Sequence, residues 1–268
     1  MRRASLCTAA FGMFGLLAGA PAAAQDMMQH VDLTSPEMTA AEMTRAEVEA
    51  AIAAATSSAR PADFSGKKLS GLDLSGLDLS SAVLRAARLN GTKLTDAKLD
   101  RAVLDQAWLL DADLRRANLR GANIFAAQMQ RAKLDGADLS GARIAADLTG
   151  ASLVGTVLSG ANLGADMKNQ SMGLMRAVLK SANLERSVLR DADLSRVDLE
   201  FASLRNADLT NASLRGASLG GANLTGATVA GADFAAADLA SARLVAPIGL
   251  DAAKNFDKAK NTDRLLRE

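Results

Sequence analysis

The chain has 268 residues, a formal net charge of +1 and only 3% aromatic residues, with no tyrosine. Because the charge is nearly balanced, nothing electrostatic favours a nucleic acid or an anionic membrane as partner. So little aromatic volume also excludes an ordinary mixed globular core, and the abundant alanine and leucine must be buried in another way.

The first 24 residues have the layout of a secretory signal peptide. Arg2 and Arg3 precede the apolar stretch 6–20, which is shorter than the roughly 20 residues that span a bilayer. Small residues ending at Ala24 supply a cleavage site. We therefore expect cleavage after Ala24 and secretion to the periplasm, with no membrane insertion afterwards. Cleavage would also remove the single cysteine, Cys7, and the two arginines, which lowers the formal charge from +1 to −1.

Residues 25–61 are expected to form a linker and an N-terminal helical cap. The stretch 25–31 is predicted to be the linker, and residues 34–58 are predicted to be helical. Three Thr and Glu pairs have the spacing of a capping box, and four apolar residues then fall on one helix face. This face should cover the first coil of the repeat that follows. The pairs are Thr34 with Glu37, Thr39 with Glu42 and Thr44 with Glu47, and the face holds Val48, Ala51, Ile52 and Ala55.

From residue 62 to residue 246 the sequence repeats with a period of five. An apolar residue, called here the centre of a unit, recurs at every fifth position from Phe64 to Ile144, and an alanine usually stands two positions before it. Small polar residues, arginine and glycine fill the other positions, as in ADLSG at 137–141. Five-residue steps would spread leucine around every face of an α-helix, and a long flat strand needs a period of two.

The spacing within one unit predicts its shape. An alanine and a centre two positions apart point to the same side of a short extended segment. The remaining residue types are typical of turns and of the surface. Each unit is therefore predicted to be a short extended step followed by a corner, and successive corners wind the chain into a coil.

The run of A-[DN]-L-x-x units, as in GANL at 160–163 and 221–224, resembles the pentapeptide-repeat family over residues 62–246. In that family four units make one square coil, and the centres of successive coils stack in columns. The resemblance implies an all-β solenoid, a right-handed quadrilateral β-helix of about nine coils. The flanking segments are expected to add short helical caps at both ends.

The charged residues support coils of four units. Residues 20 apart would then be neighbours, and Asp73, Lys93, Asp113 and Lys133 alternate in sign along one such column. We expect solvated ion pairs, each worth little, rather than general acids or calcium ligands. Further expected pairs are Asp78 with Lys98, Asp96 with Arg116, Asp111 with Arg131, Lys180 with Glu200, and Glu185 with Arg205.

The five-residue period is interrupted in one region. The step from Ile144 to Leu148 is four residues, and the step from Leu163 to Leu174 is eleven, which restores the phase. The intervening segment 164–173 contains methionines. It is either a bulge whose methionines fill an irregular gap or a partner-binding loop.

Residues 247–268 are predicted to form a C-terminal helical cap. Stacked coils need covers, because an open end exposes leucine and unpaired backbone groups. Residues 247–249 should interrupt the strands, and apolar residues then recur at helical spacing. These residues are Ala252, Phe256, Ala259 and Leu266.

The residue types of a catalytic or metal site are missing from the repeat. His30 is the single histidine and lies outside it, so neither a Ser-His-Asp set nor a histidine metal cluster can form. The glycines follow the five-residue period and do not make a phosphate-binding loop. Asp and Asn recur at one repeat position, which indicates a role in backbone turns. We therefore expect no enzyme activity, no cofactor and no metal.

These features favour a non-catalytic periplasmic scaffold or protein-interaction protein. The family resemblance offers an alternative, because some pentapeptide-repeat proteins mimic DNA and inhibit gyrase, conferring quinolone resistance. Those relatives are cytoplasmic and strongly acidic. The export signal and the near-neutral charge of this chain disfavour the alternative.

Bulky apolar residues at positions expected to face water form the candidate partner contact. The single tryptophan, Trp108, is its centre, and Lys68 and Arg88 precede it in the same column, where a cation could pack on the indole. We expect Trp108 to be exposed in the free protein and buried in a complex. The candidate contact residues are Val83, Val103, Trp108, Leu110 and Phe125.

Overall fold

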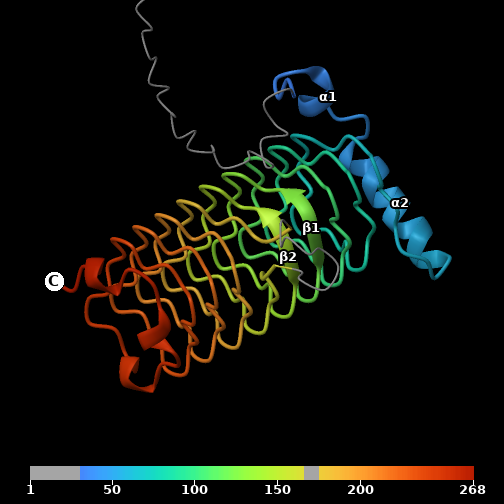
Figure 1. Cartoon of the computed structure of the whole chain (residues 1–268). Coiled ribbons are helices and arrows are strands. Elements are labelled where there is room, and N and C mark those ends of the chain that lie inside the picture. Colours follow the sequence, from blue (N-terminus) through green and yellow to red (C-terminus); the bar gives the residue numbers. More distant parts are fainter. Residues whose placement is uncertain (1–30, 166–174) are drawn as a thin grey trace, which may run out of the picture. The chain divides into compact units, whose positions relative to one another are not determined.

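The computed structural model describes residues 31–165 and 175–268 (Figure 1). The helices and strands below all lie in the compact unit Leu33–Glu268. The predicted signal peptide and the linker up to residue 30 fall outside the described residues. So do the expected centre Leu174 and the methionines of the interrupted segment.

The residues from 62 to 266 that the structure describes wind into stacked coils. Parallel bridges join residues 20 apart in four columns, so each coil has four sides. Hydrogen bonds run from one coil to the next, as from the Leu114 N–H to the Lys133 carbonyl at 2.7 Å. This pairing confirms the register that the charge pattern predicted. The columns are named here after their first members, Asp63, Lys68, Asp73 and Asp78.

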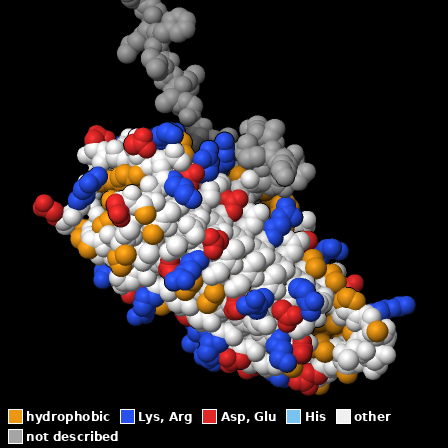
Figure 2. Space-filling model, turned by 90° about the horizontal axis from the view of Figure 1, so that it is seen from below, with side chains coloured by type: hydrophobic (Ala, Val, Ile, Leu, Met, Phe, Trp, Pro, Cys, Tyr) orange, Lys and Arg blue, Asp and Glu red, His pale blue; other side chains and the backbone are white. Residues whose placement is uncertain are grey.

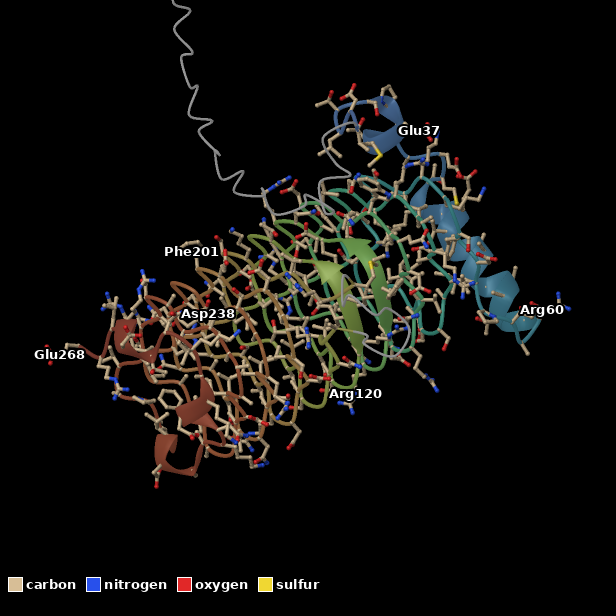
Figure 3. All side chains as sticks on the ribbon, in the orientation of Figure 1. Glu37, Arg60, Arg120, Phe201, Asp238 and Glu268 are labelled. Carbon is tan, nitrogen blue, oxygen red and sulfur yellow. The ribbon has the colours of Figure 1, made fainter. Side chains whose placement is uncertain are left out.

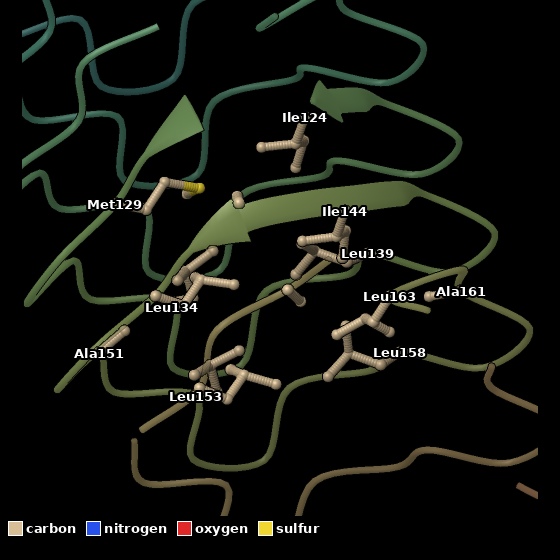
Figure 4. Packing of buried hydrophobic residues seen from close by; sticks show 14 of the residues in the cluster. Ile124, Met129, Leu134, Leu139, Ile144, Ala151, Leu153, Leu158, Ala161 and Leu163 are labelled. Carbon is tan, nitrogen blue, oxygen red and sulfur yellow. The ribbon is translucent and has the colours of Figure 1, made fainter. Parts of the chain in front are cut away.

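The alanines and centres face the inside of the coil, as predicted. Ala112 and Leu114 are fully buried, and so are Leu94 and Leu134, which precede and follow Leu114 in its column. Figure 4 shows centres of consecutive coils gathered in this interior. The core is a narrow stack of small and medium side chains, which explains how it is filled with so few aromatic residues.

Each corner is a tight turn with one left-handed residue. At the corner after Leu114, the N–H of Ala117 donates to the Leu114 carbonyl at 3.0 Å, and Arg116 between them has φ of 59°. A positive φ at that position is typical of a type II turn. The Asp before a centre reinforces such a turn: Asp73 accepts a hydrogen bond from the Ser75 N–H at 3.1 Å. The predicted backbone role of Asp and Asn is thereby confirmed.

The predicted four-residue step is a shortened corner between the Asp63 and Lys68 columns. Strand β1 (Asn123–Gln128) pairs in parallel with β2 (Arg143–Asp147), and the register shifts between Phe125 and Gln128. Beyond β2 the bridge spacing falls from 20 to 19, as between Lys133 and Ser152.

The long connection leaves from the same corner in the next coil. Asn162 lies in the Asp63 column and Val178 in the Lys68 column, so these two residues are consecutive around the coil. The Ala177 N–H donates to the Leu163 carbonyl at 3.0 Å, which closes the turn across the connection. From Val178 onwards the spacing of 20 returns.

The N-terminal cap consists of two helices, so the prediction of one helix over 34–58 is wrong. Helix α1 (Pro36–Thr39) and helix α2 (Arg45–Ser57) are separated by an extended stretch in which Ala41 pairs antiparallel with Leu69. The first coil has a free backbone edge, and pairing with that edge holds this stretch out of the helix.

Helix α2 closes the first coil in the predicted way. Thr44 and Glu47 form a capping box, and Val48 is fully buried. Ala51 and Ile52 pack against the same core. Within 31–165 and 175–268 no helix combines the length and the apolarity that crossing a membrane requires.

Residues 247–268 continue the coil, so the prediction of a helix that replaces the strands is wrong. Ile248 bridges Thr228, and three further bridges follow at steps of six. A single 3-10 turn replaces each five-residue corner, which takes one additional residue per side. Ala252 is therefore exposed, whereas Phe256 and Ala259 pack on the core as expected. The 3-10 helices are η2 (Leu250–Ala252), η3 (Phe256–Lys258) and η4 (Thr262–Arg264).

The outer surface carries ladders of ion pairs, with both charges interspersed (Figure 2). Most of the expected pairs form, but no ion pair joins Glu185 to Arg205 in the described part of the chain. Asp113 pairs with Arg115 at 2.6 Å and not with Lys93 or Lys133. The confirmed pairs are Asp73 with Lys93 (3.8 Å), Asp78 with Lys98 (3.3 Å), Asp96 with Arg116 (2.7 Å), Asp111 with Arg131 (2.6 Å), and Lys180 with Glu200 (3.0 Å).

Candidate interaction surface

The structure brings four of the five candidate contact residues to two adjacent sides of the coil. Val83 and Val103 are bridged in the Asp63 column. Trp108 lies in the Lys68 column, and Phe125 lies in β1 at the corner between these columns. All four side chains are partly exposed. We call these four residues the Trp108 surface.

Leu110 does not belong to this surface, because it is only 5% exposed. Its neighbours along the corner are Asn90 and Gln130, and Gln130 is itself buried. The Asn90 side chain accepts a hydrogen bond from the Leu110 N–H at 3.0 Å. Neighbouring side chains cover one another at this corner, so a position after a centre is not always exposed.

The cations near the Trp108 surface are placed differently from the prediction. Arg88 precedes Trp108 in its column, but its guanidinium pairs with Glu37 of α1 at 3.0 Å. The guanidinium that packs on a ring is that of Arg143, 5.0 Å from the centre of the Phe125 ring. The aromatic member that a cation covers is therefore Phe125.

The corner beside Phe125 also holds polar atoms that the coil leaves unpaired. Asp105 lies one coil before Phe125 and pairs with Arg85 at 3.6 Å, while its Oδ1 atom is buried without a hydrogen-bond partner. The side-chain oxygen of Asn123 is buried without a partner as well. An Asn at this repeat position ordinarily accepts from the backbone two residues later, as Asn118 does from Arg120 at 3.2 Å.

The departures from the repeat before the C-terminal coil all lie at this corner. The four-residue step in β2, which shifts its register against β1, and the long connection after Asn162 occupy two consecutive coils between the Asp63 and Lys68 columns. Among the described residues the other three corners keep the five-residue step until the C-terminal coil.

Comparison with known proteins assigns the family. The pentapeptide repeats family matches in eight copies, over residues 62–100, 97–141, 125–168, 174–211 and 212–245. The chain is a pentapeptide-repeat protein. Proteins of this family form right-handed quadrilateral β-helices, in agreement with the four bridged columns. They are generally structural or interaction proteins without enzymatic activity.

Solved structures of the same family resemble this pentapeptide-repeat protein. HetL from the cyanobacterium Nostoc, involved in heterocyst differentiation regulation, is 30% identical, with 80% of this chain and 96% of HetL covered and a TM-score of 0.47. Trypsin-treated QnrB1, a plasmid-mediated fluoroquinolone resistance protein, is 17% identical, with 72% and 91% covered and a TM-score of 0.39. A protein of the Arabidopsis thaliana thylakoid lumen is 23% identical, with 62% and 67% covered and a TM-score of 0.23. No curated protein sequence matches significantly.

Sequence reasoning missed Phe201, the most exposed aromatic residue in the part of the chain that the structure describes. Phe201 is 62% exposed and stands on the outside of the coils (Figure 3). It occupies a left-handed corner position with φ of 58°, and the Lys180 ammonium lies 5.8 Å from its ring centre. The available signal was a bulky residue at a position where glycine or a polar residue is usual. Its neighbours across the corner are small, so Phe201 makes no continuous apolar patch.

The surface hollow at the corner between the Asp78 and Asp63 columns offers no chemistry of its own. Arg101 and Arg120 line it, but Arg120 pairs with Asp138 at 3.0 Å and Arg101 lies 3.5 Å from Asp100. Across residues 31–165 and 175–268, no group of His, Cys, Asp and Glu side chains is placed to hold a metal ion.

Proposed function

We propose that this pentapeptide-repeat protein is an exported, non-catalytic scaffold of about nine coils that binds a protein partner through the Trp108 surface. The observation that carries the proposal is the coincidence of Trp108 and Phe125 with the corner at which the repeat departs from its period.

Folding alone does not account for these departures. A regular five-residue corner would satisfy the coil, and the other corners show that the chain can make one. Local irregularities in paired strands tend to accompany functional sites, where they re-aim side chains. Phe125 lies next to the shortened corner, because its partner in β2 is Ala145.

The chemistry of the corner suits a protein partner. Val83, Val103, Trp108 and Phe125 offer apolar contact area, and aromatic residues are enriched in the parts of interfaces that contribute most to affinity.

The proposal is tested by partner capture with matched variants. The double variant Trp108→Ala/Phe125→Ala should lose a partner that the wild-type mature chain retains from an envelope extract. The control is Phe201→Ala, which removes an exposed aromatic side chain elsewhere on the coil and should retain the partner. Both variants should melt within about 5 °C of the wild type, because none of the three residues belongs to the buried core. Equal capture by all the proteins would refute the assignment of the surface.

Trp108 also reports on its own exposure, since it is the single tryptophan of the chain. We expect iodide to quench its emission in the free protein and to quench it less when the partner is bound. Emission that resists quenching in the free protein would contradict a partly exposed indole.

The proposal of export concerns residues 1–24. It is supported by the basic start, the short apolar stretch and the alanines that end at Ala24. N-terminal sequencing of the protein recovered from the periplasm should begin at Gln25. A periplasmic protein that begins at Met1, or one confined to the cytoplasm, would contradict it.

The alternative of a DNA mimic is not favoured by the surface. A mimic needs a continuous acidic face, whereas Lys and Arg alternate with Asp and Glu along the columns. We expect no inhibition of gyrase supercoiling at micromolar protein. Inhibition that requires the folded coil would overturn this choice.

A further inference from the structure

The segment 36–42, called here the strap, lies against the same side of the coil as Trp108. It contains α1 and the extended residues that follow it. Glu37 reaches two members of the Lys68 column: its carboxylate accepts a hydrogen bond from the Lys68 ammonium and pairs with the Arg88 guanidinium at 3.0 Å. Trp108 is the next member of that column. Figure 3 marks Glu37 on α1.

The strap is seated by one apolar side chain and by backbone pairing. Met38 is only 4% exposed. Its carbonyl accepts a hydrogen bond from the Asn90 side chain at 3.1 Å, and the same side chain accepts one from the Leu110 N–H. The Glu42 N–H donates to the Lys68 carbonyl at 2.9 Å, beside the antiparallel pair of Ala41 with Leu69.

The pairing of Ala41 and Glu42 is the kind that an extended peptide makes when it adds to a sheet edge, whereas Glu37 and Met38 make their contacts from the helical turn α1. Backbone hydrogen bonds supply affinity without regard to sequence, and side-chain pockets supply the specificity. Here the Lys68 and Arg88 cations recognise a carboxylate, Asn90 holds a backbone carbonyl, and the next position buries an apolar side chain, that of Met38.

The strap can leave without opening the core. Helix α2 is held independently, because Val48 is fully buried and the Arg45 guanidinium donates to the carbonyls of Asp73 at 2.9 Å and Ser75 at 3.2 Å. The Glu37 side chain is 52% exposed, so salt and water weaken its ion pairs. A single helical turn such as α1 has little stability of its own.

We propose that the strap is an exchangeable internal ligand: it occupies a peptide site on the Lys68 column, and a segment of a protein partner replaces it there by presenting a carboxylate and then an apolar residue in a helical turn, followed by an extended stretch. The site consists of the Leu69 backbone edge, Lys68, Arg88 and Asn90. This inference rests on the proposed function and deepens it, because it names the chemistry of a partner segment that binds next to Trp108 in the Lys68 column.

The test uses a peptide that copies the strap. A fluorescent peptide of sequence Ser-Pro-Glu-Met-Thr-Ala-Ala-Glu-Met, matching residues 35–43, is titrated into the full mature chain. The variant Glu37→Lys should repel Lys68 and Arg88 and free the site, so the peptide should bind it with a Kd at least about tenfold lower than it binds the wild type. The control Asp257→Lys makes the same change of charge in the C-terminal coil and should bind like the wild type.

Two further arms keep the result unambiguous. Adding Arg88→Glu to Glu37→Lys should abolish binding, and a peptide with lysine in place of its first glutamate should not bind. Glu37→Gln serves if Glu37→Lys fails to fold, since it removes the charge without repulsion. Equal affinity for the wild type and the Glu37 variants, or no saturable binding to any of them, would overturn the proposal. Adding Glu37→Lys to the Trp108→Ala/Phe125→Ala variant should still allow the peptide to bind, because the strap site is intact. Peptide binding tests the strap site and partner capture tests the Trp108 surface, so the two assays can fail separately.

Discussion

Replacing Leu114 by alanine tests the core of the coil directly. Leu114 is fully buried between Leu94 and Leu134, and Leu114→Ala removes three carbon groups at about 0.8 kcal/mol each, or about 2.4 kcal/mol of transfer free energy. The cavity adds to this loss, because hydrogen bonds of 2.7 Å from Leu94 to Asp113 and from Leu114 to Lys133 hold the adjacent coils in place. We therefore expect a loss in the free energy of unfolding of about 3–5 kcal/mol.

Urea unfolding at 25 °C, followed by circular dichroism, measures this loss. Lys98→Ala is the matched control on the outside, because the Lys98–Asp78 pair at 3.3 Å is more than half exposed on both sides. It should cost less than about 1 kcal/mol. Leu114→Lys should cost more than Leu114→Ala, since it places an unpaired charge in the stack. Equal midpoints for the Leu114 and Lys98 variants would refute the inward register.

Three further predictions concern the corners, the carboxylates and the cap. Gly155→Ala should lower the free energy of unfolding by about 1 kcal/mol. The loss comes from the φ of 63° alone, because the new methyl group would meet open space. Gly249→Ala should cause a larger loss, since its Cβ would lie 2.7 Å from that of Ala230. Hydrogen bonds from Ser75 to Asp73, from Arg116 to Asp96 and from Arg115 to Asp113 lower the pKa of each carboxyl. A carboxyl with a lowered pKa stabilises the fold at pH values above its ordinary pKa, and this stabilisation is lost as the pH falls. The urea midpoint should therefore fall as the pH drops below about 4, and it should fall less in Asp113→Asn. Thr44→Ala, which breaks the capping box, should cost about 1 kcal/mol and should leave the peptide affinity of the strap site unchanged. Equal losses for the two glycine variants, a midpoint independent of pH, or an unchanged stability of Thr44→Ala would each contradict the corresponding argument.

The candidate surface was only partly predictable from the sequence. Residues 20 apart had to be neighbours once the coil was recognised, so the contact between Val83 and Val103 followed from their numbers. The burial of Leu110 could not be inferred from the period, because it depends on the conformations of the neighbouring side chains at the corner. The sequence also did not show that Arg88 pairs with Glu37 instead of packing on Trp108. Glu37 lies far from Arg88 in the sequence, and only the docking of α1 brings the two together.

The C-terminal coil carried a signal that a search for helical spacing passes over. The triplet Ala-Lys-Asn recurs at 253–255 and 259–261, a period of six that matches the bridged residues Lys254 and Lys260. The alanine and phenylalanine positions also fit a helical period, and over so short a segment the two periods are hard to separate. The preceding coil decides between the helix and the six-residue coil. Its backbone groups offer hydrogen bonds that a further coil can make and that an isolated helix would leave unmade.

The sequence by itself determined what repeats: the inward alanines and centres, a turn at each corner and the register of 20. These features depend on residues within one unit or one coil, so a fixed spacing encodes them. The tertiary structure alone decided what happens once. It placed the shortened corner of β2 and the long connection on one edge, and it laid the strap on the Lys68 column. Such contacts join segments that no fixed spacing relates, so their geometry follows from how the coils and the cap pack and not from the period.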